Sequence, residues 1–224
     1  HQLAVRTMAT QGHVIVCGYG DSGSISAHEL RQRGWDADRI VVIDADPDAV
    51  QRAAERGAIG LHGNAASEEL LKVAGIERAH AVIVSVGRDD TTVLVVLTIR
   101  EVSKQVRIIA RVNEQENLKL VRASGADVLV SPPRFGGFLM ADAVEHQGTV
   151  DFVSELLSIR GDYQLQEREP QPAEIGRRAL DIPGSLVVEI RRGSQRLGSW
   201  RHKDLMIEPG DRLFVIDSSD DAGA

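Results

Sequence analysis

"HVIVCGYGDSGSISAHELRQRG", residues 13–34, is an apolar run that leads through three closely spaced glycines into an amphipathic segment. The β-branched residues at its start are typical of a buried strand. Gly18, Gly20 and Gly23 form the pattern G-x-G-x-x-G, whose glycines permit a tight turn, close approach of the backbone to a phosphate, and close packing of a helix on the strand. The stretch therefore predicts a strand, a phosphate-binding turn and a helix with its N-terminus at the anion.

Five further apolar runs follow this stretch, with amphipathic segments between them. Their residues alternate poorly, which indicates strands that are buried on both faces of a parallel sheet. The sequence predicts an α/β fold with a Rossmann-like, doubly wound parallel sheet over residues 13–131. The six expected strands are residues 13–17, 39–44, 58–62, 81–86, 106–111 and 126–131.

The ends of the intervening helices carry local signals. Ser67 is expected to cap a helix that begins with Glu68 and Glu69, because acidic side chains are favourable at a helix N-terminus. Gly75 and Gly125 are expected to end helices, since glycine readily adopts the left-handed conformation found there. These signals agree with the alternation of strands and helices.

The chain changes character after residue 131. Two prolines end the last strand, and the residues after them predict a crossover helix. Gly136 and Gly137 are expected at its start, because a glycine inside a helix costs about 1 kcal/mol. The runs "SLVVEIRRG" and "DRLFVIDS" predict a small β-rich C-terminal subdomain. The expected parts are a linker at 1–12, the Rossmann-like lobe at 13–131, a crossover and dimerisation segment at 132–148, the C-terminal subdomain at 149–219 and a tail at 220–224.

The composition argues against several classes of protein. A formal net charge of −7 and a pI of about 5.5 do not suit the basic surface that nucleic acids require. The longest apolar runs, 81–86 and 93–97, are much shorter than the roughly 20 residues of a membrane-spanning helix. Cys17 is the only cysteine, which removes intrachain disulfides, and we expect it to be buried in the first strand.

A carboxylate at the end of the second strand supplies a second test of the glycine pattern. Asp44 lies 44 − 23 = 21 residues after Gly23, close to the spacing of about 20 expected for a ribose-binding acid. Such an acid favours a free ribose 2′-hydroxyl over a 2′-phosphate through charge repulsion. Asp46 is an alternative, although a helix cap before Pro47 explains it better. A retained fold with an empty site is the other explanation of the pattern.

The sequence offers no catalytic constellation beside this turn. Six of the seven histidines are spread over different elements, and none of the six is paired by spacing with a nucleophile or a carboxylate. They are His13, His28, His62, His80, His146 and His202. A nicotinamide-dependent oxidoreductase would also need a proton donor, and the C-terminal subdomain offers no obvious one. We therefore expect a binding protein rather than an enzyme, with no catalytic and no metal-binding residues.

Several longer stretches resemble the family of RCK (regulator of potassium conductance) domains, in their Trk/Ktr-type form. The marks are "HVIVCGYGDSG", "VVIDADPDAV", "GLHGNAASEELLKVAGIERAHAVIVSVGRDD", "VRIIARVNEQENLKLVRASGADVLVSP", "LVVEIRRGSQRLGS" and "IEPGDRLFVID". The third of these stretches is more specific than any glycine motif. The resemblance covers almost the whole chain and both of its expected lobes.

The resemblance implies an assembly and a location. Members of this family have a Rossmann-like N-lobe, a crossover helix that pairs subunits and a C-lobe that extends the dimer. The homodimers typically form an octameric ring beneath a potassium-channel pore or a separate membrane subunit. Residues 1–12 are then the end of the linker to that pore, and the chain lies at the cytoplasmic face of the cell membrane.

The resemblance also bears on ligand identity. Calcium-gated members carry carboxylates at positions that here hold Ser85, Arg111 and Asn113, so calcium is the less expected ligand. Other acids could form a different ion site, but a solvated face is the preferred interpretation of them. These acids are Asp89, Asp90, Glu114 and Glu116.

Nucleotide-binding members of the family have a glycine turn, an acid after the second strand and a "GDA" turn after the third. Asn64 replaces the usual aspartate of that last turn. Asp21 stands where such members often have a basic residue, which makes ATP less favoured than NAD(H), ADP or AMP. Arg111 either compensates by pairing with phosphate or forms a salt bridge with Glu114 or Glu116. The residues expected to contact the nucleotide are Gly18, Tyr19, Gly20, Asp21, Ser22, Gly23, Asp44, Ala45, Asp46, Gly63, Asn64, Ala65, Ser85 and Arg111.

The resulting hypothesis is a cytosolic, ligand-sensing regulatory module of a potassium channel or transporter. It would bind an adenine nucleotide or dinucleotide in the Rossmann cleft and couple that binding to the gating of a membrane pore. The alternatives are an NAD-dependent oxidoreductase and a structural ring whose cleft is empty.

Overall fold

The computed structural model describes residues 11–159 and 161–218, which form two compact units divided between Phe138 and Leu139. The predicted tail at 220–224 and all but the last two residues of the predicted linker lie outside the described residues.

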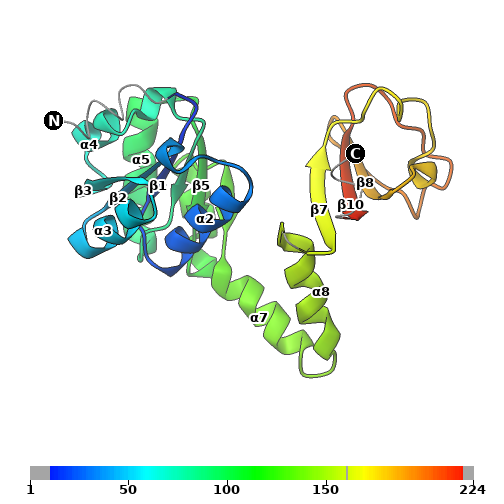
Figure 1. Cartoon of the computed structure of the whole chain (residues 1–224), viewed down its shortest axis with the longest axis horizontal. Helices are drawn as coiled ribbons and strands as arrows, with labels where there is room; N and C mark the ends of the chain where they lie inside the picture. Colours follow the sequence, from blue (N-terminus) through cyan, green and yellow to red (C-terminus); the bar gives the residue numbers. More distant parts are fainter. Residues whose placement is uncertain (1–10, 160, 219–224) are drawn as a thin grey trace. The chain divides into compact units, whose positions relative to one another are not determined.

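The first unit contains a six-stranded parallel sheet in the order β3-β2-β1-β4-β5-β6 (Figure 1). This order confirms the predicted Rossmann-like, doubly wound sheet, because the chain winds outward from β1 in one direction and then from β4 in the other. Each strand lies inside its predicted run. The strands are β1 (Val14–Cys17), β2 (Ile40–Asp44), β3 (Ile59–His62), β4 (Ala81–Val84), β5 (Arg107–Arg111) and β6 (Val128–Val130).

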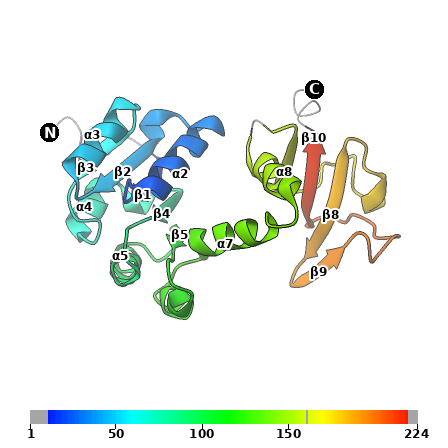
Figure 2. The same cartoon turned by 90° about the horizontal axis from the view of Figure 1, so that it is seen from below.

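Helices cover both faces of this sheet, and Figure 2 shows α2 and α3 on one side and α5 on the other. The helices are α2 (Asp21–Gln32), α3 (Pro47–Glu55), α4 (Glu68–Val73), α5 (Asp89–Val102) and α6 (Leu118–Ala123), with short 3₁₀ helices η1 (Ala37–Arg39), η2 (Ile76–Arg78) and η3 (Gln115–Asn117). Alternate residues of β1 enter different cores: Ile15 and Cys17 pack on one face, and Val14 and Val16 on the other. Burial on both faces therefore explains the continuous apolar runs.

Cys17 and the predicted helix ends behave as expected. Cys17 is fully buried, and this burial raises the pKa of its thiol to about 12. The hydroxyl of Ser67 accepts a hydrogen bond from the Leu70 amide at 3.3 Å and caps α4. Gly75 and Gly125 follow their helices with φ angles of 77° and 112°.

The helix after the first unit's last strand corrects one prediction. Helix α7 (Pro132–Asp142) begins at the first proline, so Gly136 and Gly137 lie in its interior instead of at its start. Proline fits the first turn of a helix because the missing N–H would have no partner there. The carbonyl of Ser131 accepts from the amide of Phe135 at 3.2 Å and closes this turn before the glycines.

The second unit contains a four-stranded antiparallel sheet in the order β7-β10-β8-β9, which confirms the predicted β-rich C-terminal part. Buried positions alternate with more exposed ones along β8 and β10, so one face of the sheet covers a small core that includes Val187, Ile190, Leu213 and Val215. The elements are α8 (Gln147–Leu157), β7 (Tyr163–Arg168), η4 (Ala179–Asp181), β8 (Ser185–Arg192), β9 (Gln195–Gly198) and β10 (Arg212–Ser218).

Candidate functional site

A cavity of about 420 Å³ lies in the first unit at the carboxyl ends of the parallel strands. Its walls come from the turn after β1, the end of β2, the loop after β3 and the ends of β4 and β5. β1 and β4 are neighbours at the point where the strand order reverses. Open α/β sheets bind their ligands in the crevice at this reversal point.

The three glycines of the turn have different structural roles. A Cβ on Gly18, whose φ is 93°, would lie 2.6 Å from the carbonyl oxygen of Ser85, and one on Gly23 would lie 1.9 Å from that of Gly18. Gly20 has an ordinary φ of −73°, and no atom lies within 4 Å of its Cβ position. The fold itself thus requires the first and third glycines, whereas the second leaves open space beside the backbone.

Helix α2 begins at this open space. Gly20 is its N-cap residue, and no side chain of the described residues caps the helix by a hydrogen bond. The first amide groups of a helix lack partners within the helix, and its dipole places partial positive charge there. The arrangement suits an anion, although Asp21, the first helical residue, brings a negative charge to the same end.

The carboxylate of Asp44 is held beside the turn. One of its oxygens accepts from the amide of Tyr19 at 2.6 Å, and the other accepts from the amide of Asp46 at 2.8 Å. A carboxylate has about four acceptor positions, so two remain for a ligand's hydroxyl groups. Asp46 itself caps α3 by accepting from the amide of Asp48 at 2.9 Å, which confirms the cap interpretation.

Two polar side chains in the cavity wall each have a buried atom without a hydrogen-bond partner among the described residues. Ser85 is only 6% exposed, and its hydroxyl has no hydrogen-bond partner among the described residues. The buried Nε of Arg111 is also without one, and no ion pair joins Arg111 to Glu114 or Glu116 in the described part of the chain. Buried polar groups are rarely left unsatisfied, so these two atoms indicate a wall built for a polar ligand.

Most of the predicted site residues come together here. The lining includes Gly18, Tyr19, Gly20, Asp44, Ala45, Asp46, Gly63, Asn64, Ala65, Ser85 and Arg111. Asp21, Ser22 and Gly23 do not line the cavity but form the adjoining first turn of α2. Sequence reasoning missed Arg52, Gly87 and Thr91 among others. Arg52 carried a weak signal, because it lies on the helix that Asp46 caps and contacts that carboxylate at 3.8 Å.

The prediction of a solvated acidic face is wrong for Asp89. This residue is 8% exposed and accepts four hydrogen bonds from the loop after β5. The donors are the Asn113 amide at 2.8 Å, its side-chain amide at 3.1 Å, the Glu114 amide at 2.9 Å and the Asn117 side chain at 2.8 Å. Burial raises the pKa of Asp89, but these hydrogen bonds outweigh it and the net shift is downward. The loop after β5 lies beside the start of α5, and Asp89 holds this loop in place through these hydrogen bonds.

Metal-binding and membrane-spanning features were sought over residues 11–159 and 161–218. No group of three or more histidine, cysteine, aspartate or glutamate side chains in these ranges has the geometry to hold a metal ion. No helix within them is both long enough and apolar enough to cross a bilayer.

The fold defines a Rossmann-like α/β domain with a cavity at the switch point of its sheet. Residues 14–132 match the family model of the TrkA-N domain, and the chain belongs to that family. The Trk system potassium uptake protein TrkA of Mycobacterium tuberculosis is 31% identical over 211 residues, which cover 91% of each chain. The probable potassium channel protein 2 of Methanocaldococcus jannaschii is 27% identical over 206 residues, which cover 88% of this chain and 58% of that protein.

Solved structures extend the likeness to both units. The GsuK RCK domain has 26% identity and a TM-score of 0.54, over 95% of this chain and 45% of that chain. The GsuK channel bound to NAD has 26% identity and a TM-score of 0.53, and the match covers 92% of this chain and 36% of that one. GsuK bound to ADP has 28% identity and a TM-score of 0.53, and the match covers 65% of this chain and 37% of that one. These matches confirm the resemblance to RCK domains. The chain spans less than two thirds of several relatives that it matches.

Proposed function

We propose that the chain is a regulatory module of a potassium channel or potassium uptake system, and that it senses an adenine nucleotide in the cavity at the ends of β1 to β5. The observation that carries this proposal is the conjunction of an uncapped α2 N-terminus, a half-engaged Asp44 carboxylate and the unpartnered polar atoms of Ser85 and Arg111. The names of the relatives, which are potassium channels and potassium uptake proteins, support the regulatory role.

Each part of a nucleotide has a complementary group in this proposal. The phosphates lie at Gly20 and the start of α2, and the ribose hydroxyls donate to Asp44. The base lies toward Ala45 and Asn64, whose side-chain oxygen already accepts from the amide of Ala66 at 2.9 Å. The side-chain amide nitrogen of Asn64 then serves as the donor to the base. Arg111 supplies a cation on the far wall.

The proposed site binds and does not react. Within the described residues, the cavity lining contains no histidine, cysteine or lysine that could exchange a proton with a substrate. Its carboxylates, Asp44 and Asp46, already accept hydrogen bonds from backbone amides, which hold both side chains in place. We propose that the chain regulates potassium transport through a second, membrane-embedded subunit or segment at the cytoplasmic face of the membrane. Four expectations stay predictions: the homodimer, the octameric ring, the linker role of residues 1–12 and the pairing role of residues 132–148.

Thermal stabilisation tests the nucleotide proposal. We expect NAD, NADH, ADP or AMP at millimolar concentration to raise the melting temperature by several degrees, because a ligand at 100 times its Kd stabilises the folded state by about 2.7 kcal/mol. Asp44→Asn removes the charge that accepts from ribose and should abolish most of the shift. Asp36→Asn makes the same charge change at an exposed position outside the cavity and should keep it. An unchanged melting temperature with every nucleotide would instead favour an empty cleft, and steady consumption of NADH with carbonyl substrates would favour an oxidoreductase.

The charge of Asp21 sets the phosphate preference in this proposal. Asp21 is exposed and is the first residue of α2, where the phosphates are expected. Its carboxylate should repel each added phosphate, so we expect AMP and NAD to bind more tightly than ATP. Asp21→Asn should strengthen ATP binding about fivefold while changing AMP binding less, since surface charge effects at a helix end are about 1 kcal/mol. Isothermal titration with both nucleotides measures the ratio, with Asp38→Asn as the exposed control. An unchanged ATP-to-AMP ratio would place the phosphates elsewhere.

A further inference from the structure

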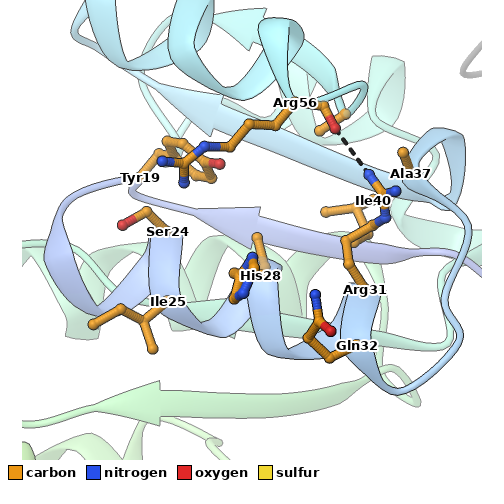
Figure 3. Close-up of a pocket in the computed structure, with 11 residues that line it drawn as sticks. Tyr19, Ser24, Ile25, His28, Arg31, Gln32, Ala37, Ile40 and Arg56 are labelled. Atoms are coloured by element: carbon orange, nitrogen blue, oxygen red, sulfur yellow. Dashed lines mark hydrogen bonds between the residues drawn. The ribbon is translucent and has the colours of Figure 1, made fainter.

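A second and larger cavity, of about 650 Å³, lies in the first unit between α2 and α3 (Figure 3). It has the size of small-molecule sites, which are typically about 300–1,000 Å³. Among the described residues, Tyr19 alone lines both this cavity and the proposed nucleotide site. The floor of the larger cavity is apolar, because Ala27 and Ile40 are 5% and 1% exposed and Ala58 is half-buried. We call it the α2–α3 cavity.

The charged residues of the α2–α3 cavity are all basic. Arg31 and Arg56 line it together with His28, and no aspartate or glutamate does so among the described residues. This is unusual for a chain with a formal net charge of −7. A cation is favourable near the C-terminus of a helix, which explains Arg31 at the end of α2 and Arg56 at the end of α3. This effect does not explain why carboxylates are missing around the cavity between the two helices.

One of the two arginines, Arg31, is held in place without being neutralised. Nη1 of Arg31 donates to the backbone carbonyl of Arg56 at 2.9 Å, a bond that spans the gap between α2 and α3 (Figure 3). Figure 3 also shows the side chain of Arg56 extending along the cavity in the direction of Tyr19. In the described part of the chain, neither guanidinium forms an ion pair. Each therefore retains donors for an external anion.

Tyr19 supplies a further polar group to the wall of the α2–α3 cavity. The residue is 3% exposed, and its ring lines the α2–α3 cavity. Its hydroxyl forms no hydrogen bond with any described residue, although the backbone amide of Tyr19 is bonded to Asp44. The hydroxyl is not among the fully buried polar atoms that lack a partner, so it reaches the open space of the cavity. It is therefore available to an oxygen atom of a bound molecule.

We propose that the α2–α3 cavity is a second binding site, which takes a small organic anion: a carboxylate or phosphate monoester with an aliphatic or aromatic body. The anionic group pairs with Arg31 and Arg56, and the apolar body lies on Ala27, Ile40 and Ala58. The hydroxyl of Tyr19 donates to an oxygen of the ligand. This site is separate from the proposed nucleotide site and does not depend on it.

Titration with phenyl phosphate, followed by backbone amide NMR, tests this site. We expect saturable shifts that are largest at residues 24–31 and 56–58, with weaker binding of benzyl alcohol, which lacks the charge, and of inorganic phosphate, which lacks the apolar body. Arg56→Ala removes an exposed side chain and should weaken the binding of phenyl phosphate about tenfold, as expected for the loss of a charge-assisted contact. His28→Glu, which places a carboxylate in the lining on an exposed helix face, should weaken it as well.

The matched control is Arg52→Ala, one helical turn before Arg56 on α3. Arg52 lines the other cavity, so its loss should leave phenyl phosphate binding unchanged. Shifts that never saturate, or equal affinity for the wild type and Arg56→Ala, would overturn the proposal. So would binding that depends on Arg52 and shifts Gly18 and Gly20, because the anion would then occupy the proposed nucleotide site. Nucleotide binding takes no part in this experiment, so either proposal can fail alone.

Discussion

Gly20→Ala is expected to abolish nucleotide binding and leave the protein folded. The φ angle of Gly20 is −73°, and its Cβ position has no neighbour within 4 Å, so alanine fits without strain. The added methyl group would occupy the space in which a pyrophosphate approaches the backbone. We expect the free energy of unfolding to fall by no more than about 1 kcal/mol, the usual cost of alanine at an N-cap. The thermal shift produced by ADP or NAD should disappear.

Gly23→Ala is the matched comparison and should give the opposite pattern. Its Cβ would lie 1.9 Å from the carbonyl oxygen of Gly18, so the turn or the helix must move. We expect a loss of several kcal/mol, about the size seen for severe overpacking, and a lower melting temperature without any ligand. Circular dichroism melts with and without ADP separate the two outcomes. If Gly20→Ala kept the full ADP shift, the phosphates would not lie at this turn, and the proposed nucleotide pose would be wrong.

Asp89→Ala is expected to be among the most destabilising substitutions of a charged residue in this chain. It would leave two backbone amides and two side-chain amides of the loop after β5 without their acceptor. Each unsatisfied buried donor costs about 1–3 kcal/mol, and water entering the space recovers part of this, so we expect a net loss of about 3 kcal/mol. Denaturant unfolding measures it. Asp90→Ala, which breaks an exposed pair with Arg88, should change little.

The same carboxylate predicts a dependence on pH. The pKa of Asp89 is lower in the folded protein than its ordinary value. Its contribution to the free energy of unfolding is therefore complete above the pKa of an aspartate in the unfolded chain, about 3.9. The contribution is lost as the pH falls through the lower, folded pKa. The difference in unfolding free energy between wild type and Asp89→Ala should therefore be constant near neutral pH and shrink below about pH 4. A difference that grew in acid would show that Asp89 is not held as an ionised acceptor.

Local signals in the sequence predicted much of the fold and part of the site. The apolar runs located all six parallel strands, because burial on both faces needs continuous β-branched residues. Ser67 and Asp46 were correctly interpreted as caps, since a cap depends on residues two or three positions away. The glycines at 136 and 137 were misplaced because proline and glycine signals compete there, and the prolines start the helix at Pro132.

By itself, the sequence determined where the six parallel strands lie along the chain and the glycine turn between β1 and α2. These features depend on neighbours along the chain. The bond between Asp44 and the amide of Tyr19, 25 residues away, also needs the parallel pairing of β1 and β2. Only the tertiary structure decided which polar groups are satisfied. Asp89 accepts from donors 24 to 28 residues away, while Oγ of Ser85 and Nε of Arg111 have no hydrogen-bond partner among the described residues, although all three residues lie near strand ends. The spacing of α2 and α3, which creates the α2–α3 cavity, is equally a product of packing. Hydrogen-bond partners and cavities belong to pairs of distant segments, and a one-dimensional pattern of polar and apolar residues does not contain them.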